Sequence, residues 1–506
     1  MAASSSDSSS TAAAAFQIVP GVQSYDWGLK GNQGSSVARY AQATEQLNFK
    51  LEQDKPYAEL WMGTHPTLPS KLAQDPQQTL SSYLHQHPDL VTQAIFDKFG
   101  SGKDDNGRDT GVLPFLFKVL SIGKALSIQA HPDKELAQKL HKENPDMYKD
   151  PNHKPEMAIA LSPFRGFCGF RPLGDIANFV QDVPELRTLI APGEELSDRL
   201  IAAAAANDAK SEESKAVLRE VFARLMKAKK DDVDLQVESI VARYSGALQN
   251  QNAEALEVPA ELAQLVVTLN EQFPSDIGIF CAFVLNVVSL ETGQAMFLQA
   301  NEPHAYLSGQ IIECMAASDN VVRAGLTPKA RDVDVLTSML TYRSAKSEEQ
   351  LMSPSPFPPL PTSSTYSLYT IDDPESRADA TAVGSSSDGR GTLPPDAGLP
   401  SSQHSGSSPP TLLYDPPIDE FAVLLTRLTS EQSEDQRPIR GPSILLHAEG
   451  QGSFIAKHPQ HATVEVQLDQ PGKVYFLAAN TQLSLFASKT ASEEGDFLLV
   501  RAFVEA

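Results

Sequence analysis

Cysteine is scarce in this chain of 506 residues. Only Cys168, Cys281 and Cys314 occur; they lie far apart, and no C-x-x-C spacing is present. An odd number of widely spaced cysteines argues against a disulfide framework and against a thiolate zinc site. We therefore expect small buried thiols in a reducing, cytoplasmic protein.

Basic residues are in deficit. Lys and Arg number 41 against 64 Asp and Glu, which gives a formal net charge of −23. Nucleic acids and anionic membranes bind clustered cations, so this balance argues against both as partners. Nothing in the sequence indicates an obligate protein partner. An anionic substrate would need a local group of Lys and Arg.

Long apolar runs are also missing. The longest, Gly278 to Leu290, is interrupted by Asn286 and is shorter than the ~18–20 residues that cross a bilayer. No Lys or Arg precedes Lys30, and the Ser/Ala-rich start has no apolar stretch typical of a secretory signal. We expect no membrane segment, and we expect residues 1–15 to form a disordered extension.

The remaining sequence changes character along its length. Residues 16–172 contain short apolar runs bounded by Gly and Pro, which predict strands of a sandwich or barrel. Residues 173–276 are poor in Gly and repeat apolar side chains with helical spacing, which predicts a helical insertion. Strand character returns at Ile277, continues through Leu298 and carries the first barrel on to residue 352. The apolar spacing around Val333–Leu340 predicts one short helix.

The last part of the chain contains two contrasting segments. Residues 353–410 consist mainly of Ser, Pro, Gly, Asp and Thr, which predicts a low-complexity linker or insertion. Short apolar runs separated by glycine-containing turns then predict a second, smaller β-barrel over residues 411–506. The predicted fold class is therefore mainly β, with a helical insertion and two barrels.

The segment Ser127–Pro132 carries the first candidate site residues. Side chains alternate along a strand, so Ser127, Gln129 and His131 share one face. Inward-facing Gln and His side chains can supply two metal ligands. The simpler alternative is a hydrogen-bonded histidine at a polar strand end.

The segment Tyr148–Glu156 carries the second group of candidate site residues. Two prolines and an asparagine predict an irregular approach to a strand and place Glu156 at its mouth. A charged, solvated turn before a buried strand is the alternative interpretation.

The segment His304–Lys329 completes the set. The preceding turn delivers His304 onto a strand, so Gln129, His131, Glu156 and His304 together offer nitrogen and oxygen donors without a thiolate. Such a set suits Zn²⁺, although Fe²⁺, Mn²⁺ and Co²⁺ accept the same donors. Further along, proton-transfer and anion-binding chemistry is available from Asp319, Arg323 and Lys329.

These segments resemble the type I mannose-6-phosphate isomerases (phosphomannose isomerases), zinc enzymes of the cupin class. Tyr148–Glu156 and His304–Lys329 match two signatures of that family, and three shorter stretches also resemble it: Tyr25–Gly28, Glu59–Gly63 and Gln129–Lys134. The similarity covers the chain apart from the N-terminal tail and the Ser/Pro-rich segment.

The resemblance implies a fold and a site. The fold would be a cupin-type jelly-roll catalytic barrel in two parts, residues 16–172 and 277–352, with a helical domain and a smaller C-terminal jelly-roll barrel. One Zn²⁺ per chain would be held by Gln129, His131, Glu156 and His304. The family's catalytic arginine falls on Arg323. Polar residues lining the family's pocket fall on Lys118, Ser127, Lys154 and Lys329.

The implied reaction is the reversible aldose–ketose isomerisation of mannose 6-phosphate and fructose 6-phosphate, a small sugar-phosphate substrate. It proceeds through a metal-stabilised enediolate and feeds GDP-mannose synthesis and mannose use. Arg323 suits either the enediolate or the phosphate. Lys118, Lys329 and Ser127 are candidates for the phosphate. The base stays open among three residues: Lys154, His153 and Asp319.

Two other classes of function compete with this interpretation. A non-catalytic cupin would lack a ligand or Arg323, and neither is missing here. An Fe²⁺ cupin dioxygenase would not need a phosphate-binding group of cations, whereas this chain carries one. The sequence therefore favours the isomerase.

Overall fold

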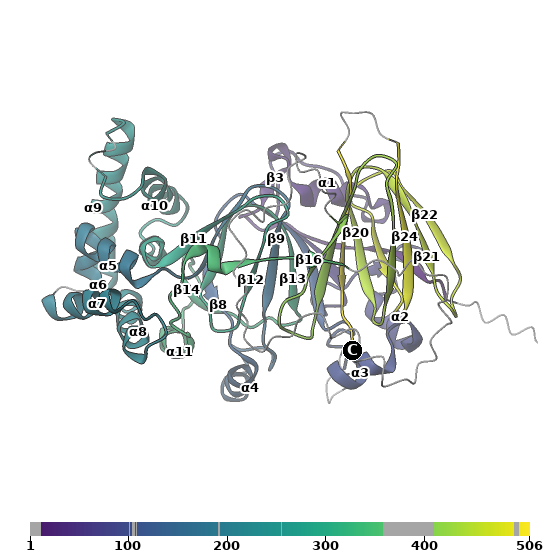
Figure 1. Cartoon of the computed structure of the whole chain (residues 1–506), viewed down its shortest axis with the longest axis horizontal. Helices are drawn as coiled ribbons and strands as arrows, with labels where there is room; N and C mark the ends of the chain where they lie inside the picture. The colour runs from purple at the N-terminus through teal and green to yellow at the C-terminus, as the bar shows by residue number, and fades with distance from the viewer. Residues whose placement is uncertain are drawn as a thin grey trace, which may run out of the picture.

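The computed structural model has helices at one end, a β-rich centre and a second β-rich body at the other end (Figure 1). It describes residues 12–100, 102–103, 107, 109–190, 193–252, 254, 256–357, 409–489 and 495–506. Most of the predicted N-terminal extension and most of the predicted low-complexity segment lie outside these residues. No helix within the described ranges is both long and apolar enough to span a bilayer.

The central sheet is built around β13 (His304–Ala316). Its main path runs through β15 (Leu351–Met352), β12 (Ala295–Leu298), β9 (Glu156–Ala160), β13, β7 (Phe115–Ile122), β5 (Glu59–Gly63) and β2 (Gly21–Gln23). Four further strands attach beside it: β8 (Ile128–Ala130), β10 (Phe164–Phe170), β11 (Leu285–Leu290) and β14 (Val322–Gly325).

β13 changes partners along its length. Residues 304–308 pair with β10 and β8, whereas residues 309–316 pair with β7 and β9. The change falls at Gly309, whose φ is 111° and where a Cβ would lie 2.6 Å from the carbonyl oxygen of Pro163. Only glycine tolerates both conditions, so this residue lets one strand join the two halves of the central barrel.

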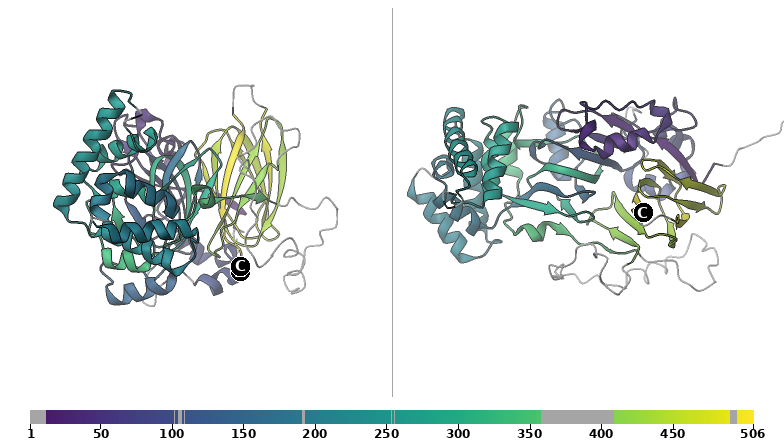
Figure 2. Two further views of the ribbon diagram at one scale, coloured as in Figure 1. Left: turned by 60° about the vertical axis from the view of Figure 1, so that its left-hand side comes forward. Right: turned by 90° about the horizontal axis from the view of Figure 1, so that it is seen from above.

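The helical insertion lies at one end of the molecule, as the turned views also show (Figure 2). The described residues of this region form six α-helices. They are α5 (Leu173–Asp182), α6 (Pro184–Ile190), α7 (Glu194–Ala206), α8 (Glu212–Met226), α9 (Lys230–Gln249) and α10 (Ala260–Gln272). Apolar residues of α8 face inward, and the ring of Phe222 packs edge-on against Phe170 of the barrel at 5.2 Å. The predicted helical insertion is confirmed, with its helices between Leu173 and Gln272.

The strand predicted from Ile277 is wrong over its first residues. Ile277–Phe283 form the 3₁₀ helix η5, and strand structure begins only with β11. The Asp276 carboxylate accepts a hydrogen bond from the Gly278 N–H at 2.7 Å and so begins the turn. A short, fully buried apolar run has no periodicity that separates a strand from a helix.

The second barrel contains two sheets. The larger is β16 (Ser355–Pro356), β17 (Thr411–Tyr414), β18 (Ala422–Leu428), β25 (Phe497–Phe503), β20 (Ser443–Glu449), β23 (Val474–Leu477), β1 (Ala15–Val19) and β6 (Lys71–Leu72). The smaller is β19 (Ser433–Ile439), β24 (Thr481–Ala487), β21 (Gly452–Lys457) and β22 (Val464–Leu468).

The N-terminal boundary differs from the prediction of an extension over residues 1–15. Ala15 begins β1, and Ala14 is buried and donates its N–H to the Ala462 carbonyl at 3.1 Å. β1 pairs with β23, with Phe16 opposite Phe476, so this strand belongs to the second barrel. The partner lies more than 450 residues away along the chain, which is why the local pattern did not reveal it.

The two barrels share one apolar core. Phe117, Met157 and Ile312 of the central sheet belong to the same buried cluster as Phe476 and Val500 of the second barrel. The barrels therefore form a continuous body.

The short elements around them are α1 (Ser36–Gln42), α2 (Leu80–Gln86), α3 (Gln93–Phe99), α4 (Lys134–Glu143), α11 (Val333–Met339), β3 (Leu29–Lys30) and β4 (Pro56–Tyr57). α11 confirms the predicted short helix.

Candidate metal centre and active site

Three buried side chains converge inside the central barrel. His131 follows β8, Glu156 begins β9 and His304 begins β13. Each side chain is at least 98% buried, and one ligand atom from each lies within 4.8 Å of the other two. Each histidine Nε2 is 3.4 Å from a different Glu156 oxygen. The end of β8 and the starts of β9 and β13 thus bring these three residues together, although His131 and His304 are 173 positions apart in the sequence.

The backbone orients both imidazoles. His131 Nδ1–H donates to the Asn320 carbonyl at 2.6 Å, and His304 Nδ1–H donates to the Glu302 carbonyl at 3.0 Å. This assignment leaves each Nε2 with a free lone pair, and neither Nε2 has a hydrogen-bond partner among the residues that the structure describes. Two buried acceptors without donors, turned toward one carboxylate, are the arrangement that a divalent cation requires.

Burial and neighbouring charge set the protonation states. Burial lowers the pKa of His131 to about 4, so the imidazole is neutral near pH 7. Burial by itself would raise the pKa of Glu156, but its polar and charged neighbours, chiefly the positive charge of Lys154, outweigh burial and hold the pKa well below its usual range. A neutral imidazole and an ionised carboxylate are the forms that bind metals.

Gln129 and Arg323 lie beside this cluster in the sheet register. Gln129 is opposite His304 on one side and opposite Arg323 on the other. Directly opposite residues project from the same face of an antiparallel pair. Gln129 is half-buried, and its amide oxygen is the remaining donor of the predicted ligand set.

Arg323 is a half-buried cation whose side chain has no hydrogen bond or ion pair to any described residue. Burial lowers the pKa of Arg323 from its ordinary value, yet a guanidinium stays protonated at physiological pH. A guanidinium that no described side chain neutralises, opposite Gln129 in the sheet, is suited to bind an anionic group.

Lys154 lies closest to the cluster. Its Nζ is 3.1 Å from Glu156 Oε1, and its side chain is largely buried. It thus places a cationic or proton-carrying nitrogen next to the predicted metal.

Lys118 has its charge already compensated. Its Nζ lies 3.1 Å from Glu313 and 3.8 Å from Glu59, and 4.8 Å from the centre of the Trp61 ring. Burial alone would lower the pKa of Lys118, but the two carboxylates outweigh it and raise the pKa above its ordinary value. Lys118 therefore pairs with Glu59 and Glu313, two carboxylates to which the sequence analysis assigned no role. The signal available was the alternation Glu59-x-Trp61, which places both residues on one strand face.

The other predicted residues occupy different positions. Ser127 is half-buried, two residues before Gln129, and Lys329 is exposed in the loop after β14. Asp319 is exposed and lies 3.8 Å from Nε2 of the buried His65, which sequence reasoning missed. His153 Nε2–H donates to the Glu420 carboxylate at 2.6 Å, and Glu420 comes from the second barrel.

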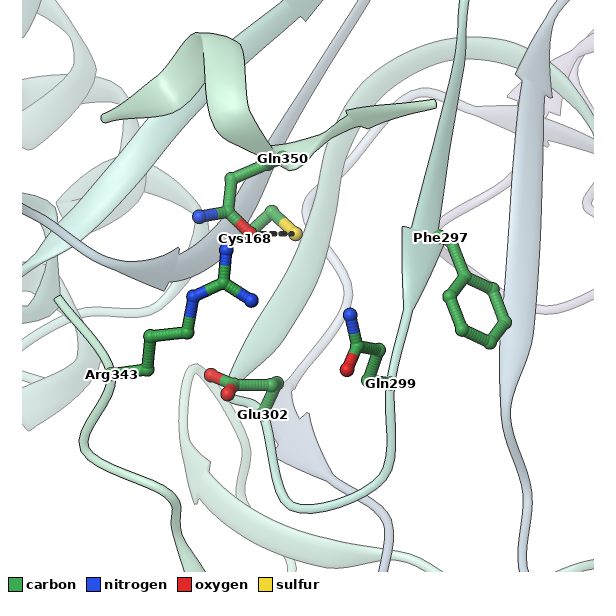
Figure 3. A pocket seen from close by; sticks show the side chains of 6 residues that line it. All are labelled: Cys168, Phe297, Gln299, Glu302, Arg343 and Gln350. Atoms are coloured by element: carbon green, nitrogen blue, oxygen red, sulfur yellow. Dashed lines mark hydrogen bonds between the residues drawn. The ribbon is translucent and has the colours of Figure 1, made fainter. Parts of the chain in front are cut away.

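A small pocket lies next to the N-terminal end of β13 (Figure 3). It is lined by Cys168, Phe297, Gln299, Glu302, Arg343 and Gln350. Cys168 is opposite His304 in the β10–β13 pairing, and burial raises the pKa of its thiol to about 12. The thiol is therefore protonated near pH 7 and is a poor nucleophile. The three cysteines are free and buried, as predicted.

The fold and this cluster define a class: a double-barrel metalloprotein of the cupin type, with two histidines and one carboxylate buried beside an unpaired arginine. Family models of type I phosphomannose isomerase match three parts of the chain. The catalytic domain matches residues 15–173, the helical insertion domain residues 192–285 and the C-terminal part residues 411–459.

Individual relatives cover nearly the whole chain. Mannose-6-phosphate isomerase from Cryptococcus neoformans var. neoformans serotype D is 41% identical over 504 residues, which cover 97% of this chain and 99% of the relative. The Saccharomyces cerevisiae enzyme of that name is 40% identical over 499 residues, covering 97% and 98%. The chain belongs to the type I phosphomannose isomerase family.

Solved structures agree. Mannose 6-phosphate isomerase from Salmonella typhimurium, bound to its substrate fructose 6-phosphate and to zinc, superposes with a TM-score of 0.66 at 25% identity, covering 98% of this chain and all of that one. A mannose 6-phosphate isomerase bound with zinc and yttrium gives 0.66 at 26% identity, covering 98% and 100%. The predicted fold class, mainly β with a helical insertion, is confirmed.

Proposed function

We propose that this chain interconverts mannose 6-phosphate and fructose 6-phosphate with Zn²⁺ held by Gln129, His131, Glu156 and His304. The observation that carries the proposal is the pair of buried, unpartnered Nε2 atoms that face one carboxylate. Family membership supports the reaction. Bound Zn²⁺ would supply Lewis acidity at the substrate oxygens.

The side chains around the cluster suit the proton transfer between C2 and C1. We assign the transfer to Lys154, because its Nζ lies 3.1 Å from Glu156. The alternatives are less well placed: His153 is turned toward Glu420, and Asp319 is exposed beside His65. Arg323 donates its forked N–H groups where negative charge develops on the enediolate oxygens.

Phosphate binding falls to other residues in this proposal. Ser127 offers a hydroxyl donor near Gln129, and Lys329 offers an exposed ammonium in the loop after β14. Lys118 is left out of the phosphate site in this proposal, because Glu313 and Glu59 already neutralise its charge. The local cations that a chain of charge −23 needs are thus Arg323, Lys329 and Lys154.

We also propose a division of the chain by role. The site residues fall in residues 16–172 and 277–352, with residues 173–276 as the helical domain and 411–506 as the C-terminal barrel. A cytoplasmic location is supported by the free, buried cysteines. The predicted insertion at 353–410 lies mostly outside the described residues.

The test is metal-dependent isomerisation. Protein purified without added metal should contain close to one zinc per chain, and a strong chelator should abolish conversion of mannose 6-phosphate to fructose 6-phosphate. Adding Zn²⁺ back should restore the activity, since the ligands remain in the folded chain. Full activity in a verified metal-free preparation would reject the zinc assignment. Iron content with oxygen consumption would instead favour a dioxygenase, since two histidines and a carboxylate also hold Fe²⁺.

A further inference from the structure

Glu420 of the second barrel contacts the segment Tyr148–Glu156, which contains Lys154. Glu420 lies in the connection between β17 and β18, and its carboxylate accepts a hydrogen bond from His153 Nε2–H at 2.6 Å. The two side chains are only 11% and 19% exposed, so the bond is largely shielded from solvent. The hydrogen bond and charge of His153 outweigh burial and hold the pKa of Glu420 below its ordinary value. Glu420 is therefore an ionised acceptor near neutral pH.

Glu420 is firmly anchored on its own side. Its neighbour Phe421 is 2% exposed and belongs to the apolar core that the two barrels share. Interiors of this kind are close-packed and transmit displacements. The carboxylate is thus presented by a rigid support.

His153 is coupled directly to the proposed proton-transfer residue. One peptide bond joins it to Lys154, and Pro155 then leads into Glu156, so the backbone between them has little freedom. Lys154 Nζ lies 3.1 Å from Glu156 Oε1. A shift of His153 would therefore change the position of this nitrogen relative to the metal ligand.

The loop after β13 also holds the segment Tyr148–Glu156, through residues other than His153. Ser318 Oγ–H donates to Asp150 Oδ1 at 2.8 Å, and Asn320 Nδ2–H donates to the Asn152 carbonyl at 2.9 Å. Asn320 is also the residue whose carbonyl orients His131. Glu420 supplies the second support, from a different barrel.

We propose that Glu420 is a positioning residue of the active site, holding His153 and through it Lys154 at the metal ligand Glu156. The C-terminal barrel would then take an indirect part in the reaction, through the position of Lys154. The inference rests on the proposed isomerase function and assigns Glu420 no contact with the substrate.

The experiment compares Glu420→Ala and Glu420→Gln with Asp419→Ala. Asp419 is the adjacent residue and makes a different contact, an exposed ion pair at 3.2 Å to Lys98 of α3. Glu420→Ala should lower kcat by about 10- to 100-fold, the range expected from displacing a reacting group by a fraction of an ångström to one ångström. KM and bound zinc should match those of the Asp419→Ala control, which should keep wild-type kcat. All variants are assayed well below their thermal midpoints, because losing a largely buried hydrogen bond also lowers stability.

The variant Glu420→Gln keeps an acceptor oxygen but loses the charge, so kcat should fall by about 3- to 10-fold, since a charge-assisted bond is roughly twice as strong as a neutral one. Adding Glu420→Ala to His153→Ala should cause no further loss, because Glu420 acts through His153.

Three results would overturn the inference. One is an unchanged kcat in Glu420→Gln and, where it folds, in Glu420→Ala. Another is a kcat loss that only tracks loss of zinc or of thermal stability. The third is an additional loss on the His153→Ala background. Wild-type protein assayed alongside separates the two levels: an inactive wild type rejects the proposed function and the inference with it, whereas an active wild type with unaffected Glu420 variants rejects the inference alone.

Discussion

At the scale of single residues, the site depends on backbone carbonyls as much as on its ligands. The carbonyls of Asn320 and Glu302 take the Nδ1–H groups of His131 and His304, which turns both Nε2 atoms toward Glu156. Such outer contacts fix the tautomer and the ring orientation before any metal binds. Arg323 is different: nothing among the described residues neutralises it, so its charge is available to a substrate.

Arg323→Lys tests whether the shape or only the charge of this side chain matters. A lysine keeps the charge but loses the planar fork, so kcat should fall by roughly 10²–10³-fold, the scale of losing one oriented oxyanion donor. Bound zinc should stay normal, since Arg323 is not a ligand. The measurements are kcat, KM and zinc content of the purified variant. Wild-type kcat with a raised KM alone would make Arg323 a binding residue instead.

At the scale of elements, ion pairs hold the helical insertion together. Arg243 of α9 donates to Glu185 of α6 at 2.6 Å and also pairs with Glu257, which precedes α10. Tyr244 O–H donates to the other Glu257 oxygen at 2.8 Å. Glu257 thus joins two donors of α9 to the segment that begins the last helix.

Glu257→Gln should lower the free energy of unfolding at pH 7 by about 1–2 kcal/mol, because it removes a partly buried charge from two hydrogen bonds. Arg243 and Tyr244 outweigh burial and lower the pKa of Glu257 below its model-peptide value of 4.5. The stabilisation is therefore complete above pH 4.5 and is lost as the pH falls through the lowered pKa.

The measurement for Glu257 is urea unfolding, followed by far-UV circular dichroism at several pH values. Glu213→Gln is the control, since Glu213 pairs with Arg199 while 68% exposed and should change stability little. A difference between wild type and Glu257→Gln that does not shrink below pH 4.5 would contradict this account.

The change of strand partners at Gly309 of β13 gives a second prediction at the scale of elements. Gly309→Ala would place a Cβ 2.6 Å from the Pro163 carbonyl oxygen at a φ of 111°. We expect a loss of about 2 kcal/mol or more in stability, from strain and steric overlap together. Gly246→Ala in α9 is the matched control: no atom lies within 4 Å of its Cβ position, and alanine should add about 0.5–1 kcal/mol. Equal midpoints in thermal unfolding would show that β13 relaxes around residue 309.

At the scale of the whole molecule, the two barrels are joined by their shared apolar core and by β1, an N-terminal strand that pairs within the second barrel. β1 belongs by sequence to the first part of the chain and by hydrogen bonding to the second barrel. Phe16 of β1 stacks on Phe476 at 5.1 Å and packs edge-on against Tyr83 of α2 at 5.3 Å. The second barrel therefore contains residues from both ends of the chain.

Phe16→Ala should cost about 3–5 kcal/mol of stability, the usual loss for removing a buried aromatic ring. Loss of isomerase activity on heating and loss of β-structure should occur together in wild type and variant, because one core serves both barrels. Parallel activity and circular dichroism melts provide the check. Two separate transitions would show that the barrels unfold independently.

The sequence by itself determined the ligand chemistry and the order of domains. His131, Glu156 and His304 stand in motifs whose residue types predict a metal site, and the helical spacing in residues 173–276 predicts the insertion. These signals are local: a strand alternates and a helix repeats within a few residues, so periodicity and composition report them directly.

Tertiary structure alone decided the contacts between distant segments. Lys118 meets Glu313 across the β7–β13 pairing, His153 meets Glu420 at a separation of 267 residues, and β1 pairs with β23. Each contact depends on strand register or on the packing of one barrel against the other. Neither register nor barrel packing produces a periodic pattern in the sequence. The role of Lys118 and the contribution of the C-terminal barrel therefore follow only from the folded protein, because pairing between distant strands is set by the burial of the whole core.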